Sequence, residues 1–127
     1  MKLELKHLAP YLPYGLRVRV DYYSQHEGRI FNFSPTILLD FSRDEYIVKP
    51  ILRPLSELTK EIEVNGKNVN IFDRIEIYKG SGVDYLIEQI RFGFVEVIIY
   101  NILLENHFDV FGLIEKGLAI DINTLNK

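Results

Sequence analysis

Apolar and polar residues alternate most clearly between residues 16 and 23. One face of an extended segment would carry Leu16, Val18, Val20 and Tyr22, and the other face would carry Arg17, Arg19, Asp21 and Tyr23. Successive side chains of a strand point to opposite faces, so this period of two predicts a strand with one buried face.

Three further strands follow from the same pattern. Residues 24–28 favour a hairpin connection in which Gly28 takes a positive φ, and residues 29–33 form the returning strand. Residues 36–41 and 46–52 are the third and fourth strands, and Pro50 places the fourth at an edge or a bulge because proline has no N–H. Four short antiparallel strands indicate a meander or a small half-open β-barrel.

Residues 56–72 allow two structures. Leu55, Leu58 and Ile62 share a helical face after a possible N-cap at Ser56, and Asn65-Gly66 would end that helix. The same Asn-Gly pair is also typical of a two-residue hairpin turn, because apolar residues alternate on both sides of it. The pattern leaves both open, and we favour the helix, with residues 68–78 extended after it.

The C-terminal half has helical spacing. Val83, Leu86, Ile87 and Ile90 predict an amphipathic helix that Gly93 ends, and residues 94–107 predict a second one. The second helix is apolar on nearly all sides, so other elements must cover it. We expect the sheet of the same chain to cover this helix. The alternative is a homodimer in which Ile99 is buried against a second copy of the chain.

These elements predict an α+β fold in which an N-terminal antiparallel meander or small half-open β-barrel packs against C-terminal helices. The length of 127 residues suits a single domain over residues 1–127. The absence of cysteine excludes disulfides, thiolate metal sites and cysteine nucleophiles. No long apolar run and no signal-peptide pattern is present, so we expect a soluble cytoplasmic protein without a membrane partner.

The net charge of −3 does not match a dedicated nucleic-acid binder, because such domains are strongly basic. Residues 1–60 carry a net charge of +2, and residues 61–127 carry −5. This is the mixed surface of an ordinary small domain.

Three blocks of the chain resemble small uncharacterised proteins encoded by phages and prophages of Bacteroides-type gut bacteria. The blocks are MKLELKHLAPYLPYGL (1–16), ILRPLSELTKEIEVNGK (51–67) and NHFDVFGLIEKGLAIDINTLNK (106–127). The resemblance implies a non-enzymatic accessory protein that works in the cytoplasm of a bacterial host by binding an unidentified protein partner. No catalytic residue can be carried over from these proteins to this chain.

The candidate binding residues lie on the predicted sheet. Arg17, Arg19 and Tyr23 alternate onto one face, and Arg29 returns on the neighbouring strand. Guanidinium groups beside an exposed aromatic ring suit phosphate and base contacts, so the alternative function is a small β-barrel that binds nucleic acid. The competing interpretation is that the arginines cover the open face of the sheet and pair with Asp21 or Glu27 across strands.

Metal and catalytic chemistry have little support in the sequence. Glu105, His107 and Asp109 form a dense group of potential metal ligands, but a helix ending here would spread them around its axis. His107 more simply caps the last carbonyls of that helix. Asp40, Asp44 and Glu45 more simply solvate one turn than pair as acid and base. We therefore predict no metal site, no cofactor and no catalytic residue.

Overall fold

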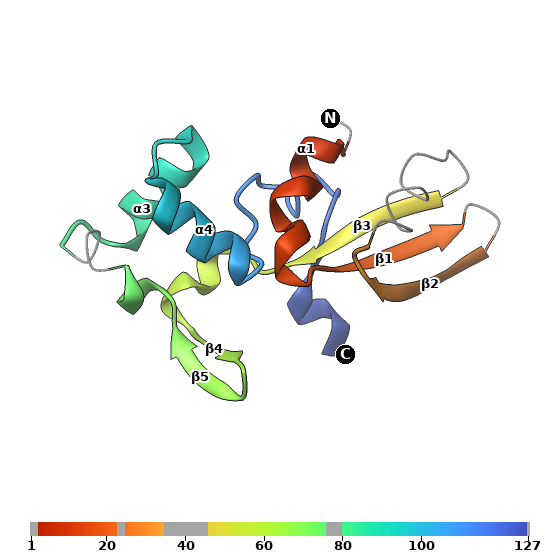
Figure 1. Cartoon of the computed structure of the whole chain (residues 1–127), viewed down its shortest axis with the longest axis horizontal. Coiled ribbons are helices and arrows are strands. Elements are labelled where there is room, and N and C mark those ends of the chain that lie inside the picture. The colour runs from red at the N-terminus through yellow and green to blue at the C-terminus, as the bar shows by residue number, and fades with distance from the viewer. Residues whose placement is uncertain (1–2, 23–24, 35–45, 76–79, 127) are drawn as a thin grey trace.

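The computed structural model in Figure 1 describes residues 3–22, 25–34, 46–75 and 80–126. Its α-helices are α1 (Leu5–Leu8), α3 (Val83–Phe92) and α4 (Val97–Glu105). Its 3-10 helices are η1 (Ala9–Tyr14), η2 (Leu55–Thr59), η3 (Phe72–Arg74) and η5 (Ile122–Asn126). Its strands are β1 (Arg17–Tyr22), β2 (Gln25–Asn32), β3 (Tyr46–Leu52), β4 (Glu61–Val64), β5 (Lys67–Asn70) and β6 (Ile120–Asp121).

The α+β class is confirmed, with the larger sheet mainly from the N-terminal part of the chain and helices α3 and α4 from the C-terminal part. The sheet has the strand order β2-β1-β3-β6 and does not close into a barrel among the described residues. β1 pairs antiparallel with both β2 and β3, whereas the two-residue β6 pairs parallel with the end of β3. β1 is therefore central, and the order differs from a simple meander, in which the second strand would be central.

The alternation in β1 is confirmed by burial. Val18 and Val20 are buried and Arg17 is exposed. The hairpin connection was predicted wrongly, because β2 already begins at Gln25 and Gly28 lies inside this strand. The pairing of β1 with β2 shifts register between Val20 and Tyr22, where residues 26–28 of β2 form a bulge. Glycine within a strand is common at a bulge. The predicted strand over residues 36–41 lies outside the described residues.

Pro50 lies within β3, opposite Val18 of β1. On the other side of β3, β6 pairs only with Ile51 and Leu52. The missing N–H of proline is therefore tolerated here, because that side of β3 has no paired strand at Pro50 in the described structure. The prediction that Pro50 lies at an edge therefore holds for this position alone, because β3 as a whole lies between β1 and β6.

A continuous hydrophobic core links both ends of the described chain, from Leu3 to Ala119. Tyr11 and Phe108 are the largest of its fully buried side chains. In Figure 1, α1 and η1 lie between the sheet and the pair α3 and α4. α4 packs mainly against η1 and α3 packs mainly against η2, so these helices reach the sheet through the 3-10 segments.

The predicted helix over residues 56–64 is wrong, and the alternative hairpin is confirmed. β4 and β5 pair antiparallel, with Val64 opposite Lys67, so Asn65-Gly66 is a two-residue turn. Both turn residues have positive φ, 53° at Asn65 and 79° at Gly66, which is the requirement of a type I′ turn. Ser56 is exposed inside the short η2, whose N-cap is Pro54. Of the segment 68–78 that was expected to be extended, residues 68–70 belong to β5, η3 follows, and residues 76–78 lie outside the described residues.

We expect Gly66→Ala to lower the free energy of unfolding by about 1–2 kcal/mol, the cost of placing an L side chain in the left-handed region. A Cβ at Gly66 would meet no atom within 4 Å, so the cost is conformational rather than steric crowding. Ser56→Ala is the matched control and should stay within about 0.5 kcal/mol of the unmodified chain, because Ser56 caps no helix. Urea unfolding midpoints measure both effects, and the reverse ranking would contradict the hairpin.

The second long helix is shorter than predicted. α4 starts at Val97 rather than residue 94, and it ends at Glu105. Gly93 ends α3 in a left-handed conformation, as predicted, with φ of 75°. Ile99 is buried within its own chain, so a second copy is not needed to cover it.

Candidate functional site

The structure does not bring the four predicted binding residues together on one face. Directly opposed residues of an antiparallel pair lie on the same side of a sheet. Arg29 is opposite Val20, whereas Arg17 and Arg19 alternate with Val20 on β1. Arg29 therefore lies on the sheet face opposite to that of Arg17 and Arg19. Tyr23 lies outside the described residues.

The remaining basic face is partly neutralised. The guanidinium Nε of Arg19 lies 3.3 Å from a carboxylate oxygen of Asp21, two residues along the same strand. Lys49 of β3 is opposite Arg19, so it belongs to the same face. The competing interpretation expected ion pairs across strands, whereas the pair of Arg19 with Asp21 lies within β1.

The feature that the sequence did not predict is a cleft of about 700 Å³ between three separated segments. One wall is the start of η2, the second is α3 with the residues that follow it, and the third is the turn after Asp109. The lining consists of residues 54–56, 87, 90–93, 100, 109–112 and 114–116. Because apolar side chains such as Leu55, Ile87 and Ile90 line it beside charged ones, it resembles a binding cleft in composition.

The third wall is held in place by hydrogen bonds to two distant elements. The backbone N–H of Arg53 donates to His107 O and that of Asp109 donates to Arg53 O, at 2.8 and 2.9 Å, which extends the sheet by one parallel bridge. On the other side, the Tyr11 hydroxyl donates to Phe108 O and accepts from the Val110 N–H. Burial raises the pKa of this tyrosine far above its usual range, so the hydroxyl stays protonated.

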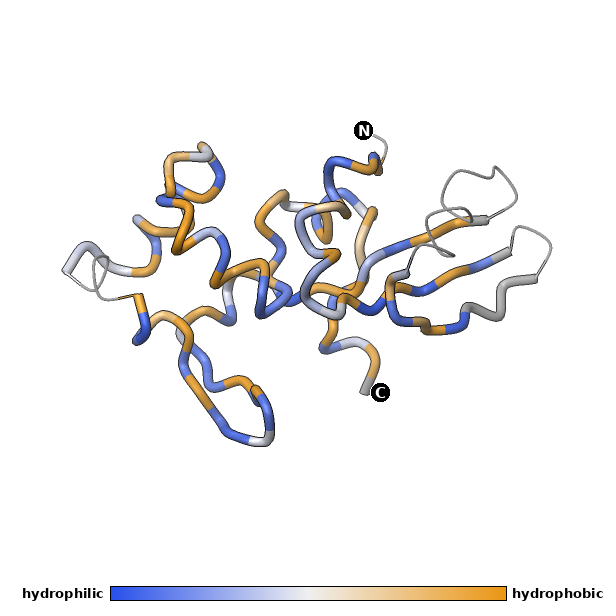
Figure 2. The backbone as a smooth tube through the Cα atoms, viewed as in Figure 1, coloured by the Kyte–Doolittle hydropathy of each residue, from blue (hydrophilic) through white to orange (hydrophobic). Residues whose placement is uncertain are grey.

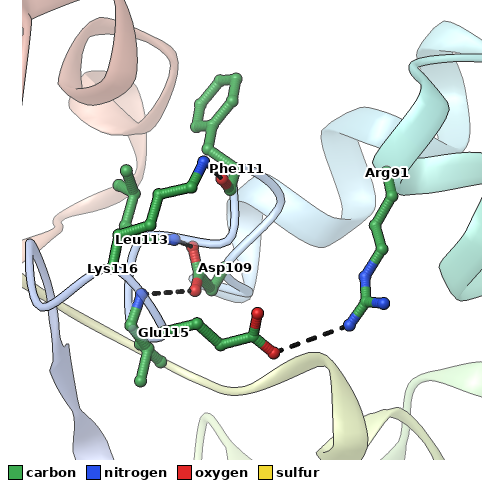
Figure 3. Close-up of polar contacts among 7 residues, drawn as sticks. Arg91, Asp109, Phe111, Leu113, Glu115 and Lys116 are labelled. Carbon is green, nitrogen blue, oxygen red and sulfur yellow. Dashed lines mark hydrogen bonds and ion pairs between the residues drawn. The ribbon is translucent and has the colours of Figure 1, made fainter. Parts of the chain in front are cut away.

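Asp109 shapes the turn itself. Its side chain is buried, and its two oxygens accept the backbone N–H groups of Leu113 and Ile114 at 2.8 and 2.9 Å (Figure 3). Burial raises the pKa of Asp109, while the same N–H bonds oppose that rise. Both carboxylate oxygens are therefore engaged in holding the backbone.

His107 does not cap α4, contrary to the prediction. The side-chain amide of Asn106 donates to Ile102 O at 2.8 Å and performs that role. His107 has a positive φ of 62°, and its ring Nε2 lies 2.7 Å from Tyr14 O. A carbonyl only accepts, so Nε2 carries the proton. Burial lowers the pKa of His107, which favours the neutral ring.

The rim of the cleft carries both signs of charge. Arg91 of α3 reaches toward Glu115 of the turn, with 3.7 Å between the guanidinium and the carboxylate, as Figure 3 shows. Both side chains are mostly exposed, so the pair contributes little stability and can separate when a ligand enters. Lys116 donates to Phe111 O at 3.5 Å on the same turn. The arrangement can hold an apolar group below a rim that offers one carboxylate and two cations.

The residues considered for metal or acid–base chemistry are separated by their structural roles. Glu105 is exposed at the end of α4, His107 bonds to Tyr14, and Asp109 points into its own turn. Within the ranges described, no three histidine or carboxylate side chains converge on a possible cation. Asp40, Asp44 and Glu45 lie outside the described residues.

Neither the protein-family models, nor the curated proteins, nor the solved structures contain a match to this chain. None of the helices in the described part of the chain is both long enough and apolar enough to cross a membrane.

Proposed function

We propose that this chain is a non-enzymatic accessory protein of a phage or prophage, and that it binds a protein partner in the cytoplasm of its bacterial host. The single observation that carries protein binding is the cleft between η2, α3 and the turn after Asp109. The three blocks that resemble phage and prophage proteins support the origin.

The cleft supports a protein partner because of its lining and its construction. Its apolar side chains are suited to one or two apolar side chains of a partner, and Arg91, Glu115 and Lys116 at the rim are suited to polar groups beside them. The third wall is fixed by buried hydrogen bonds of Tyr11 and Asp109, so the cleft is formed before binding. A preformed cleft reduces the ordering cost of association.

Capture with two matched variants tests this proposal. Ser56 lines the cleft and is exposed, so Ser56→Trp should fill the cleft without disturbing the core. Thr59 is exposed on the same 3-10 helix outside the cleft, so Thr59→Trp is the control. We expect a defined protein from infected or lysogenic cells to be captured by the unmodified chain and by Thr59→Trp. Ser56→Trp should reduce that capture at least about tenfold, through loss of the buried contact.

Two results would overturn the proposal. One is equal capture by both tryptophan variants. The other is captured nucleic acid whose binding is lost in Arg17→Glu and kept in Ser56→Trp, which would assign the alternative function to the basic sheet face.

A further inference from the structure

Four exposed apolar side chains lie close together in the sequence where α3 passes into α4. We call this set the α4 corner: Phe92, Phe94, Val97 and Ile98. Their exposed fractions are 63%, 71%, 73% and 76%. In Figure 1 this connection lies at the outer edge of the molecule, away from the sheet, and the start of α4 is coloured as hydrophobic in Figure 2.

The rest of α4 does not share this exposure. Ile99, Leu103 and Leu104 are buried against the core. At 100° per residue, Asn101 and Glu105 follow Val97 on the outward side of the helix. The exposed side of α4 is therefore apolar only in its first turn, beside the two phenylalanines.

The two aromatic rings of the α4 corner are already arranged as one surface. Phe92 and Phe94 are stacked with 6.3 Å between ring centroids and 28° between ring planes. Gly93 between them has a φ of 75°, which ends α3 and lets the chain reverse. The two rings therefore lie side by side at the end of α3 and can enter one apolar contact together.

We infer that the α4 corner joins two copies of this chain into a two-fold dimer. Two phenylalanines of about 200 Å² and two aliphatic side chains of about 150 Å², exposed to these fractions, present on the order of 500 Å² of apolar surface per copy. Two copies that cover these side chains completely bury about 1,000 Å², which is the lower limit for a specific interface.

The charges around the α4 corner are also compatible with a second copy of the chain as its partner. None of the four side chains is charged, and the residues next to the surface, Arg91 and Glu96, have opposite signs. A two-fold axis brings the same surface of both copies together, so these charges do not oppose association with a surplus of one sign. Phe92 also lines the cleft. The dimer nevertheless needs no occupant in the cleft, and the two residues changed in the test below, Ile98 and Phe94, lie outside the cleft lining.

Light scattering after size exclusion tests the dimer with the full chain. At concentrations on the order of 100 µM, well above a micromolar Kd, the unmodified chain should have twice the 14.9 kDa mass of one copy. Ile98→Asp should raise the dissociation constant at least about tenfold, because the two-fold axis places two carboxylates in an apolar contact. Leu5→Asp is the control, because Leu5 is an exposed apolar residue of α1 outside the α4 corner. This variant should remain a dimer.

Phe94→Ser is the second variant, because residue 94 lies outside both helices and its change does not depend on the stability of α4. It should also weaken the dimer, with an unchanged unfolding midpoint by circular dichroism at a concentration well below the dissociation constant, where both chains are monomeric. A monomer mass for the unmodified chain would overturn the inference. A dimer that persists in both Ile98→Asp and Phe94→Ser would also overturn it. Partner capture by the cleft is measured separately with Ser56→Trp. A negative result for the dimer therefore does not decide whether the cleft binds a partner, and the reverse also holds.

Discussion

Asp109→Ala should lower the free energy of unfolding by about 2–4 kcal/mol. The substitution removes both oxygens that accept the Leu113 and Ile114 N–H groups, and each N–H left without an acceptor away from water costs about 1–3 kcal/mol. Chemical denaturation of the purified variant measures the loss. Because the turn is one wall of the cleft, partner capture should weaken together with stability.

Two comparisons make this prediction specific. Asp109→Asn keeps one acceptor oxygen and should lose less stability than Asp109→Ala. Asp121, the last residue of β6, accepts the Asn123 N–H at the start of η5 in an exposed hydrogen bond, so Asp121→Ala should cost no more than about 1 kcal/mol. Equal losses at the two aspartates would mean that Asp109 does not hold the turn.

Tyr11→Ala should cost about 3–5 kcal/mol, as expected for deleting a large ring from a packed core. Tyr11 is fully buried, and its hydroxyl bonds to the segment that forms the third wall of the cleft. Tyr11→Phe keeps the ring and should cost about 1–2 kcal/mol, the usual contribution of buried hydrogen bonds. The difference between the two variants, measured by urea unfolding, separates packing from hydrogen bonding.

Tyr14→Phe is the control for the hydroxyl. Tyr14 is half-buried on the same η1 segment, and the bond it makes to His107 uses its backbone carbonyl, which the substitution retains. We expect a change within about 0.5 kcal/mol. A loss as large as that of Tyr11→Phe would contradict a special role for the Tyr11 hydroxyl.

Local patterns predicted the elements whose structure depends on neighbouring residues. β1 follows from the alternation of its valines and arginines, because one face of that strand is buried. α3 follows from helical spacing before Gly93. The hairpin of β4 and β5 was misjudged because Ile62 fits both a helical face with Leu58 and the alternation of a strand. The positive φ values that Asn65-Gly66 readily adopts decided between them.

The face of Arg29 could not be predicted from composition, because it depends on register. The predicted strand began at residue 29, whereas β2 begins at Gln25 and contains a bulge before Arg29. A change of one residue in register moves a side chain to the other face of a sheet. The predicted basic surface therefore separated into two faces, although each arginine was correctly placed on a strand.

The cleft was missed for a different reason. Its walls come from segments about twenty or more residues apart, near residues 55, 90 and 112, and no period in the sequence marks their meeting. One local signal was present. Asp109 precedes Gly112, whose φ is 69°, and an aspartate before such a glycine is typical of a turn held by its side chain. That signal predicts the turn, but it does not predict what packs against it.

The bonds between Tyr11 and the segment near Phe108 also constrain how the protein can be made. These partners lie 97 residues apart, and His107 meets Tyr14 across 93 residues. On a ribosome, the N-terminal segment therefore emerges long before the residues that complete its packing exist. Contacts of such long sequence separation form late and slowly. Until Val110 is free to pack, Tyr11 and its apolar neighbours lack their native cover, and exposed apolar side chains of this kind favour aggregation of the nascent chain.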